Sequence, residues 1–508
     1  MKADRLIGQR HPYSEGARLS RVQVAEKASG TQLADKPSGT LVDKVSRKPV
    51  GATSSLRNWG IKGNRHSLGI CAILFLSLLL SINLEPGTEV LPYVVTLALQ
   101  LGVCVIVLSV AKIPTLSQTK IISMLILFSV MLWFSTTALF SDYTLLSFSR
   151  FLLAFIPGFG LYLLTLLDRK PIQTFTRVLK GLLWFGVGFA LIGILISLLG
   201  TENTTEEGFV QQVSLGGLTI SQLTIPANGY DRISSLLGNP NNLGFMVFLS
   251  LMATFTLRAL GKLHGAWLIP LTLIQLTALF MTFSRANMLT FIVASFLLFL
   301  LFSKNTVHLL KRMYVALMIL ILMGIAVLQF FPFEMLDAFN RSSGLAGRED
   351  SWAVALDQVQ HHAVSGIGFA VAEQELLRAG LDISTHNSHL SVMLETGLLG
   401  YTLFFAFWCF GLWSVGRHLL ATKLKKENTL IEQDHLNRQN QQTKQHEQTK
   451  KHQQKPQQRE TIIVYSTVLT LLLAMFFHQL FETKIPYAGV PTLMWFYFLG
   501  LATKRLDR

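Results

Sequence analysis

Residues 276–300 read LTALFMTFSRANMLTFIVASFLLFL, and Arg285 is the only charged residue among them. An arginine is costly at the depth of a membrane core, so we expect this one at the end of a membrane span. The stretch therefore predicts two spans joined by a very short turn that holds Arg285. The alternative is an arginine that keeps its charged head in the interfacial water without a ligand.

The rest of the chain has the same apolar character. Of its 508 residues, 50% are hydrophobic and 14% are charged, whereas about 25% charged residues are usual in soluble domains. Apolar runs of about 17 to 25 residues recur, and this length crosses a bilayer core. The sequence predicts an all-α, polytopic membrane protein with about twelve transmembrane helices. The predicted spans are 67–84, 90–110, 120–140, 147–167, 178–200, 240–260, 265–282, 286–303, 313–331, 389–416, 461–480 and 487–503.

The basic residues orient these spans. Lys and Arg gather in cytoplasmic loops of membrane proteins. When the N-terminus is placed inside, most of the basic residues of this chain fall in the segments on the inner side. The exceptions, expected outside, are Arg150, Arg232, Arg285, Arg341, Arg348, Arg378 and Lys484. The net charge of +15 is therefore interpreted as a topology signal, and no binding of nucleic acid is expected.

The segments between the spans complete the predicted organisation. In order, we expect a disordered basic cytoplasmic tail (1–66), a membrane domain (67–416) with outer loops at 201–239 and 332–388, a Gln- and Lys-rich cytoplasmic loop (417–460), two further spans (461–503) and a cytoplasmic C-terminus (504–508). The 417–460 loop is of low complexity and is expected to be a disordered spacer, with attraction to anionic lipid headgroups as the alternative.

Metal and thiol chemistry are not expected. Cys71, Cys104 and Cys409 all fall within apolar runs, where buried free thiols are the usual outcome. Four histidines occur in the loop before the tenth span and at its start: His361, His362, His386 and His389. They lack the spacing with a carboxylate or cysteine that marks a zinc site. We therefore predict no metal and no cofactor.

Several outer residues suggest the chemistry of a site. Arg348 begins an expected helix, REDSWAVALDQVQ, and His386 precedes the tenth span, where it shares a helix face with His389 if that helix starts early. Arg232 stands before the turn GNPNN. Arginine binds diphosphate through its planar fork, and a histidine can take a proton from an attacking hydroxyl. Simpler alternatives are pairing of Arg348 with nearby carboxylates and a purely structural turn at Arg232.

The residues RISSLLGNPNNLGF, LTALFMTFSRANML, GREDSWAVALDQVQHHAVSGIGF and THNSHLSVMLETGLLG occur in this order between Arg232 and Gly400. In this third of the chain, the sequence resembles the O-antigen ligase and polysaccharide polymerase superfamily of bacterial envelope enzymes. Val364 stands where that family often has proline, which puts the turn of this loop, but not its charges, in question.

The resemblance implies a glycosyltransferase of the bacterial inner membrane whose active site faces outward. Its donor would be a glycan linked to undecaprenyl diphosphate, transferred to an acceptor hydroxyl on a lipid core sugar, a growing polymer or a protein, without metal or nucleotide. By this resemblance Arg285 and Arg348 would hold the diphosphate, His386 would act as the base, and Arg232 is a weaker candidate for binding.

A lipid-linked glycan flippase or another polysaccharide transporter is the alternative function. Transporters place their ionisable residues near the middle of the membrane, whereas the predicted spans hold few and the charges gather at their outer ends. The outward-facing enzyme is therefore favoured.

Overall fold

Long apolar helices make up most of the described part of the protein. The computed structural model describes residues 65–80, 98–103, 105, 106, 109, 117–205, 208–215, 218–227, 230–302, 348–381, 384–439 and 448–506. Among these residues, six helices are long and apolar enough to cross a membrane, and four shorter apolar helices accompany them. A helix satisfies its own backbone hydrogen bonds, which is what a span in lipid requires.

The observed helices follow the predicted spans closely. Their bounds are α1 Arg65–Leu80, α3 Gln118–Leu139, α4 Thr144–Leu167, α5 Pro171–Leu199, α6 Pro240–Ala259, α7 Leu268–Met281, α8 Arg285–Leu301, α13 Ser388–Gln439, α14 Gln448–His478 and α15 Val490–Ala502. The predicted span 313–331 lies outside the described residues, and span 90–110 is described only in part. The total of twelve spans therefore stays a prediction.

The last helix, α15, lies at the centre of the packing. All of its residues except Pro491 are buried, as expected for a helix that is apolar on every side. It packs against α1, α4, α13 and α14, while α5 and α6 pack together with α7, and α8 lies against α6 and α14. This arrangement brings α6, α8, α13 and α14, which lie far apart in the sequence, around a common region.

The prediction of an all-α fold was incomplete because the segment 201–239, predicted to be an outer loop, contains a sheet. Strands β1 Thr201–Thr205, β2 Gly208–Leu215, β3 Leu218–Ala227 and β4 Tyr230–Arg232 pair antiparallel in chain order. The segment 218–225, LTISQLTI, is rich in Thr and Ile, which favour strands. Gln222 donates a hydrogen bond from Nε2 to the carbonyl of Gly193 in α5 (3.3 Å), which fixes the sheet to the helices.

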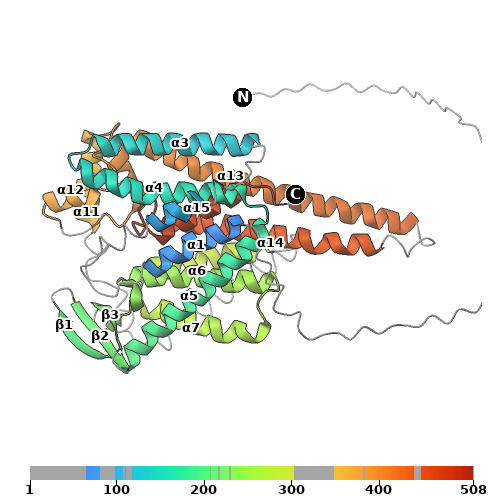
Figure 1. The fold of residues 1–508 in the computed structure, drawn as a ribbon, viewed down its shortest axis with the longest axis horizontal. Coiled ribbons are helices and arrows are strands. Elements are labelled where there is room, and N and C mark those ends of the chain that lie inside the picture. The colour runs from blue at the N-terminus through green and yellow to red at the C-terminus, as the bar shows by residue number, and fades with distance from the viewer. Residues whose placement is uncertain are drawn as a thin grey trace, which may run out of the picture. The chain divides into compact units, whose positions relative to one another are not determined.

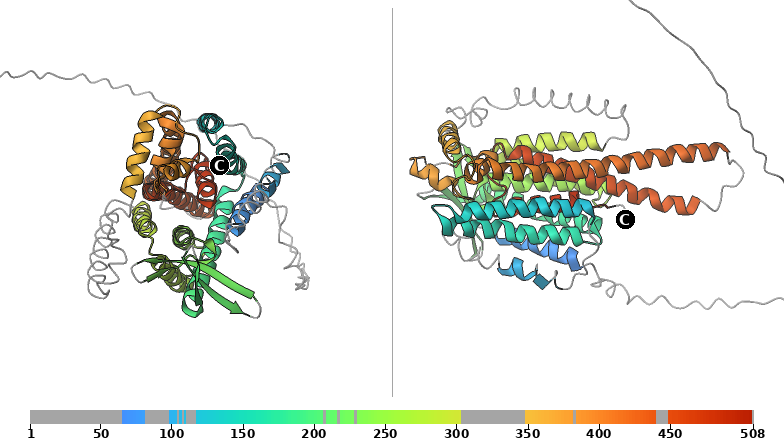
Figure 2. Two further views of the ribbon diagram at one scale, coloured as in Figure 1. Left: turned by 90° about the vertical axis from the view of Figure 1, so that its left-hand side faces the viewer. Right: turned by 90° about the horizontal axis from the view of Figure 1, so that it is seen from above.

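The two ends of the helix bundle differ (Figures 1 and 2). The strands lie at the same end as two short helices from the predicted loop 332–388, α11 Arg348–His361 and α12 Ala372–Arg378. At the other end α13 and α14 extend well beyond their neighbours. The described parts of the two predicted outer loops thus lie at one end of the bundle, opposite the described parts of the predicted cytoplasmic segment 417–460.

The expectation of a disordered spacer at 417–460 was wrong for most of that segment. Helix α13 continues to Gln439 and α14 begins at Gln448. Residues 417–439 contain neither Gly nor Pro and many Leu, Lys, Glu and Gln, all of which have good helix propensity. Helix α13 therefore continues from the membrane domain into this segment.

Candidate functional site

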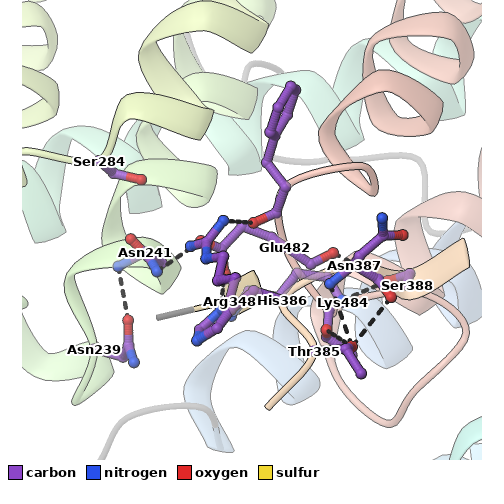
Figure 3. Close-up of polar contacts among 12 residues, drawn as sticks. Asn239, Asn241, Ser284, Arg348, Thr385, His386, Asn387, Ser388, Glu482 and Lys484 are labelled. Carbon is purple, nitrogen blue, oxygen red and sulfur yellow. Dashed lines mark hydrogen bonds and ion pairs between the residues drawn. The ribbon is translucent and has the colours of Figure 1, made fainter. Parts of the chain in front are cut away.

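The candidate site lies at the end of the bundle that carries α11 and α12. It is formed by the starts of α6, α8, α11 and α13 together with the turn 479–489 between α14 and α15. Figure 3 shows Arg348, His386 and Glu482 between Asn239, Asn241 and Ser284 on one side and Thr385, Asn387, Ser388 and Lys484 on the other. Five separate segments thus contribute polar side chains to one small region.

Glu482 is the centre of the cluster. Its side chain is buried, and Oε1 accepts a hydrogen bond from Asn241 Nδ2 at 2.8 Å. Arg348 Nη2 lies 3.8 Å from the same oxygen, and His386 Nδ1 lies 3.7 Å from Oε2. One carboxylate therefore collects a guanidinium, an imidazole and an amide from three different segments.

The surroundings of Glu482 keep it ionised. Burial alone would raise the pKa of this carboxyl, but the contact with His386 and the charge of Lys484 outweigh burial, so that the pKa is lowered. Burial lowers the pKa of Lys484, and the charge of Glu482 opposes this shift. The ammonium of Lys484 donates to Asn242 Oδ1 at 2.6 Å, so it faces the start of α6.

Arg348 is the first residue of α11, as the sequence predicted. Its Nη1 donates to the carbonyl of Phe481 at 3.1 Å, and 21% of its side chain is exposed. The guanidinium is therefore held against the α14–α15 turn while part of it still faces solvent. A helix N-terminus also favours anions through its free N–H groups, so an anion in front of Arg348 would meet both.

His386 stands just before α13, in a left-handed backbone conformation with φ of 48°. Residues other than glycine rarely adopt this conformation, although histidine is among those that do so more often. The helix α13 begins only at Ser388. His386 therefore lies before the helix and does not share a helix face with His389. His389 is buried within α13, with Nε2 3.3 Å from the Phe476 carbonyl, whereas a third of the His386 side chain is exposed.

Arg232 belongs to the supporting structure of the cluster. It is buried, its Nε donates to the Thr282 carbonyl at 2.9 Å, and its Nη2 donates to Asn241 Oδ1 at 2.9 Å. The same Asn241 donates to Glu482. Arg232 is thus linked to the central carboxylate through one amide.

Arg285 lies at the rim of the site. It is the first residue of α8 and is exposed. The preceding residues turn sharply, since Phe283 has φ of 46°. Its neighbour Ser284 accepts a hydrogen bond from Asn287 Nδ2 at 2.7 Å, so the start of α8 joins the polar region even though the arginine points to solvent.

Buried amide side chains next to the cluster form a hydrogen-bond network with its residues. Asn287 donates from Nδ2 to Ser284 Oγ (2.7 Å) and to the carbonyl of Asn241 (3.0 Å), so its Oδ1 is the acceptor facing His478 Nε2 at 3.0 Å. His478 therefore carries its proton on Nε2. Its Nδ1 then accepts from Gln479 Nε2 at 3.4 Å.

Gln479 joins the α14–α15 turn to the start of α13. Its Oε1 accepts from the backbone N–H groups of Lys484 (3.2 Å) and Ile485 (2.9 Å) and from the hydroxyl of Ser388. The carbonyl of Gln479 accepts from the Ser388 N–H at 2.9 Å. The residues on either side, His386 and Glu482, are thereby held in fixed relation.

The remaining histidines of the loop lie elsewhere. His361 ends α11 and faces the exposed Asp357, with 3.7 Å between Nδ1 and Oδ2. Within the described residues, no group of three or more His, Cys, Asp or Glu side chains could hold a metal ion. The sequence-based expectation of metal independence stays a prediction.

Sequence reasoning found Arg348 and His386 but missed the carboxylate between them. Glu482 stands in FETK, in a short outer turn between two spans, where a single acidic residue has no pattern that distinguishes it. Lys484 was counted only as one of the few outer basic residues. The useful signal would have been a Glu and a Lys two residues apart at the end of a span, at the same expected membrane side as the other charges.

Comparison with known proteins places part of the chain in a described family. No curated protein matches the chain. Residues 270–405 match the family model described as O-Antigen ligase, a region that runs from α7 into α13 and includes Arg285, Arg348 and His386. With the apolar helices, this match indicates a multi-pass membrane protein of polysaccharide biosynthesis. The resemblance of this part of the chain to the O-antigen ligase and polysaccharide polymerase superfamily is therefore confirmed.

Proposed function

We propose that this protein transfers a glycan from an undecaprenyl-diphosphate-linked donor to an acceptor hydroxyl, as an O-antigen ligase or a surface polysaccharide polymerase. The supporting observation is the convergence of Arg348 and His386 on Glu482, at 3.8 and 3.7 Å, with both side chains still partly exposed. Cationic groups suit a diphosphate leaving group, and an imidazole suits a hydroxyl nucleophile.

The diphosphate would lie against the exposed parts of Arg348, Lys484 and Arg285. Guanidinium groups bind phosphate oxygens in a bidentate manner and stay charged. Preorganised cations facing the leaving group stabilise the charge that develops on it in the transition state. Arg232 is buried and donates to Asn241, so we assign it the role of positioning Asn241 and Glu482.

His386 would act as the general base through Nε2. The acceptor hydroxyl gives its proton to the imidazole as its oxygen attacks the anomeric carbon of the donor sugar. The bond from that carbon to the diphosphate oxygen breaks, and the electron pair leaves with the lipid diphosphate. Glu482, on the Nδ1 side of the ring, stabilises the imidazolium that forms.

The local backbone supports this assignment. Left-handed residues other than glycine cost of the order of 1–3 kcal/mol and persist where the surroundings hold them. His386 and Phe283 both adopt such a conformation next to the cluster. Strained residues gather at functional sites more often than elsewhere.

The site would face outward from the bacterial inner membrane, with the extension of α13 and α14 in the cytoplasm. Ser365 and Lys425 are exposed residues on the α11 side and on the α13 extension. In a variant without the native cysteines, an impermeant thiol reagent added to whole spheroplasts should label Ser365→Cys and spare Lys425→Cys. The opposite pattern would show that the cluster faces the cytoplasm.

The activity itself is tested with purified protein and a synthetic undecaprenyl-diphosphate glycan. Released undecaprenyl diphosphate and lengthened acceptor are measured with and without a strong chelator, and Arg348→Ala is compared with Arg378→Ala. Arg378 is an exposed arginine of α12 that pairs with Asp142 at 3.6 Å. We expect transfer that survives the chelator, that is lost in Arg348→Ala and that persists in Arg378→Ala. Loss of transfer in both variants alike, or movement of intact donor across the membrane without transfer, would refute the proposal.

A further inference from the structure

Helix α13 is interrupted at Gly397, and a segment from another part of the chain fills the interruption. Gly397 has φ of 69° and ψ of 179°, which is not helical. The segment 363–371, here called the strap, runs from α11 to α12 across this break. Three backbone hydrogen bonds join them: Leu398 N–H to the Ala363 carbonyl (2.7 Å), Ile367 N–H to the Leu394 carbonyl (3.1 Å) and Gly368 N–H to the Glu395 carbonyl (2.9 Å).

Side chains of the α3–α4 turn and of α4 hold the other side of the strap. Hydrogen bonds run from Ser141 Oγ to the Ile367 carbonyl (2.9 Å), from Ser147 Oγ to the Phe369 carbonyl (2.6 Å) and from Arg150 Nη1 to the Ala370 carbonyl (2.6 Å). Phe369 and Val371 are fully buried. Residues 368–371 of the strap are therefore buried in the bundle, whereas Ser365, nearer to α11, is exposed.

The carboxylate of Glu395 lies at the end of the strap. It is 2% exposed, in α13 two residues before the break. One oxygen, Oε1, accepts from the N–H of Ala372 at 3.1 Å, the first residue of α12. The other, Oε2, accepts from the hydroxyl of Tyr487 at 2.8 Å.

These two hydrogen bonds reach both halves of the candidate site. Tyr487 lies in the same turn as Glu482 and Lys484, and its ring stacks on Phe369 of the strap (5.7 Å between centroids, 12° between planes). Ala372 follows directly on the strap, which continues from the helix that begins with Arg348. A single side chain in α13 thus connects the segment of Arg348 with the segment of Glu482.

We infer that Glu395 is a positioning residue that sets the distance between Arg348 and the Glu482–Lys484 turn. This inference rests on the proposed function, since it concerns the same site. Its physical basis is that a buried donor left without its acceptor is costly, and that a displacement of about 1 Å at a catalytic group can reduce the rate about 10²-fold.

Substitutions of Glu395 separate this role from a general effect on folding. Glu395→Leu removes both acceptors. Glu395→Gln keeps both connections, because its oxygen can accept from Ala372 and its amide can donate to the Tyr487 oxygen. Tyr487→Phe removes one connection and keeps the ring stack. Glu373→Leu, at an exposed position of α12, is the matched control.

For each variant, kcat per folded molecule and KM for the donor are measured well below the melting temperature. We expect kcat to fall about 10²-fold in Glu395→Leu with KM within about threefold, a smaller fall in Tyr487→Phe, and values near wild type for Glu395→Gln and Glu373→Leu. A Glu395→Leu enzyme that melts earlier but turns over like wild type would show a structural role only. Equal impairment of Glu395→Gln and Glu395→Leu would also overturn the inference.

Hydrogen exchange gives a second measurement that does not need activity. In Glu395→Leu, exchange should rise together in residues 372–378 and 482–487, and in Glu395→Gln it should not. Unchanged exchange in Glu395→Leu would refute the positioning role. If wild type transferred no glycan, the proposed function would fail, and the exchange result would still decide whether Glu395 connects the two segments.

Discussion

Replacing Glu482 by glutamine removes the charge beside His386 and leaves most of the geometry intact. The glutamine oxygen can still accept from Asn241, so the amide network should persist. What is lost is the attraction between the carboxylate and the imidazolium formed during proton transfer. Since the two groups lie 3.7 Å apart, an effective dielectric constant of about 20 gives an interaction of about 4 kcal/mol.

Exposure reduces this figure. A third of the His386 side chain is exposed, and solvent screens such a pair. Taking half of the Coulomb energy gives about 2 kcal/mol, which corresponds to a fall of about 30-fold in kcat. Binding of the donor should respond differently, because a negative charge near the diphosphate is removed. We therefore expect an unchanged or lower KM for the lipid-linked donor.

The assay is steady-state transfer by purified enzyme in detergent or nanodiscs, with donor concentration varied at saturating acceptor. Glu375→Gln is the control, because Glu375 pairs with Arg378 at 3.4 Å in α12, outside the cluster. A kcat within threefold of wild type for Glu482→Gln, or a raised KM with normal kcat, would refute the role given to Glu482. A similar loss in Glu375→Gln would point to a general effect of charge removal at this end of the bundle.

The other predictions concern the base, the anion-binding arginine and the break in α13. In His386→Ala, kcat should fall about 10²- to 10⁴-fold while donor binding is retained, measured by turnover and by binding of labelled donor. An active His386→Ala variant beside an inactive His389→Ala variant would show that His386 is not the base. Arg348→Lys should lower kcat/KM about 10- to 100-fold because a charge-assisted hydrogen bond is weakened, and normal kinetics would contradict a need for the planar fork. Gly397→Ala should lower the melting temperature, because φ is positive there and a Cβ would lie 2.1 Å from a strap carbonyl, whereas Gly416→Ala, with open space around it, should leave it unchanged or higher.

Much of the fold could be predicted because lipid imposes a simple pattern. Apolar runs of sufficient length marked the helices, and α3, α4, α6, α8 and α13 begin within three residues of the predicted starts. The sheet at 201–232 was missed, although LTISQLTI in β3 favours a strand, because residues 201–239 were interpreted only as a loop between spans. Gln222 of the sheet bonds to α5, and no local sequence pattern reveals such a contact with a distant segment. The break at Gly397 was missed because a single glycine in an apolar run is usually tolerated within a helix.

The site was predicted in part for a similar reason. Arg348 and His386 were conspicuous because basic residues are few in the segments predicted to lie outside, and the predicted topology placed both on that side. The prediction did not show that Arg232 would be buried and bonded to Asn241, since a buried arginine and an exposed one look alike in sequence. Glu482 and Glu395 could not be assigned because their roles depend on partners about 90 to 240 residues away.

The strap through α13 limits how the length of this chain can change over evolutionary time. Most loops accept inserted residues because a longer loop costs little additional closure entropy. Between Ala363 and Ala372, one added residue would move each later donor out of register and leave the Leu394 and Glu395 carbonyls without partners in a buried setting, which proteins rarely tolerate. Relatives of this protein should therefore keep a constant spacing between α11 and α12.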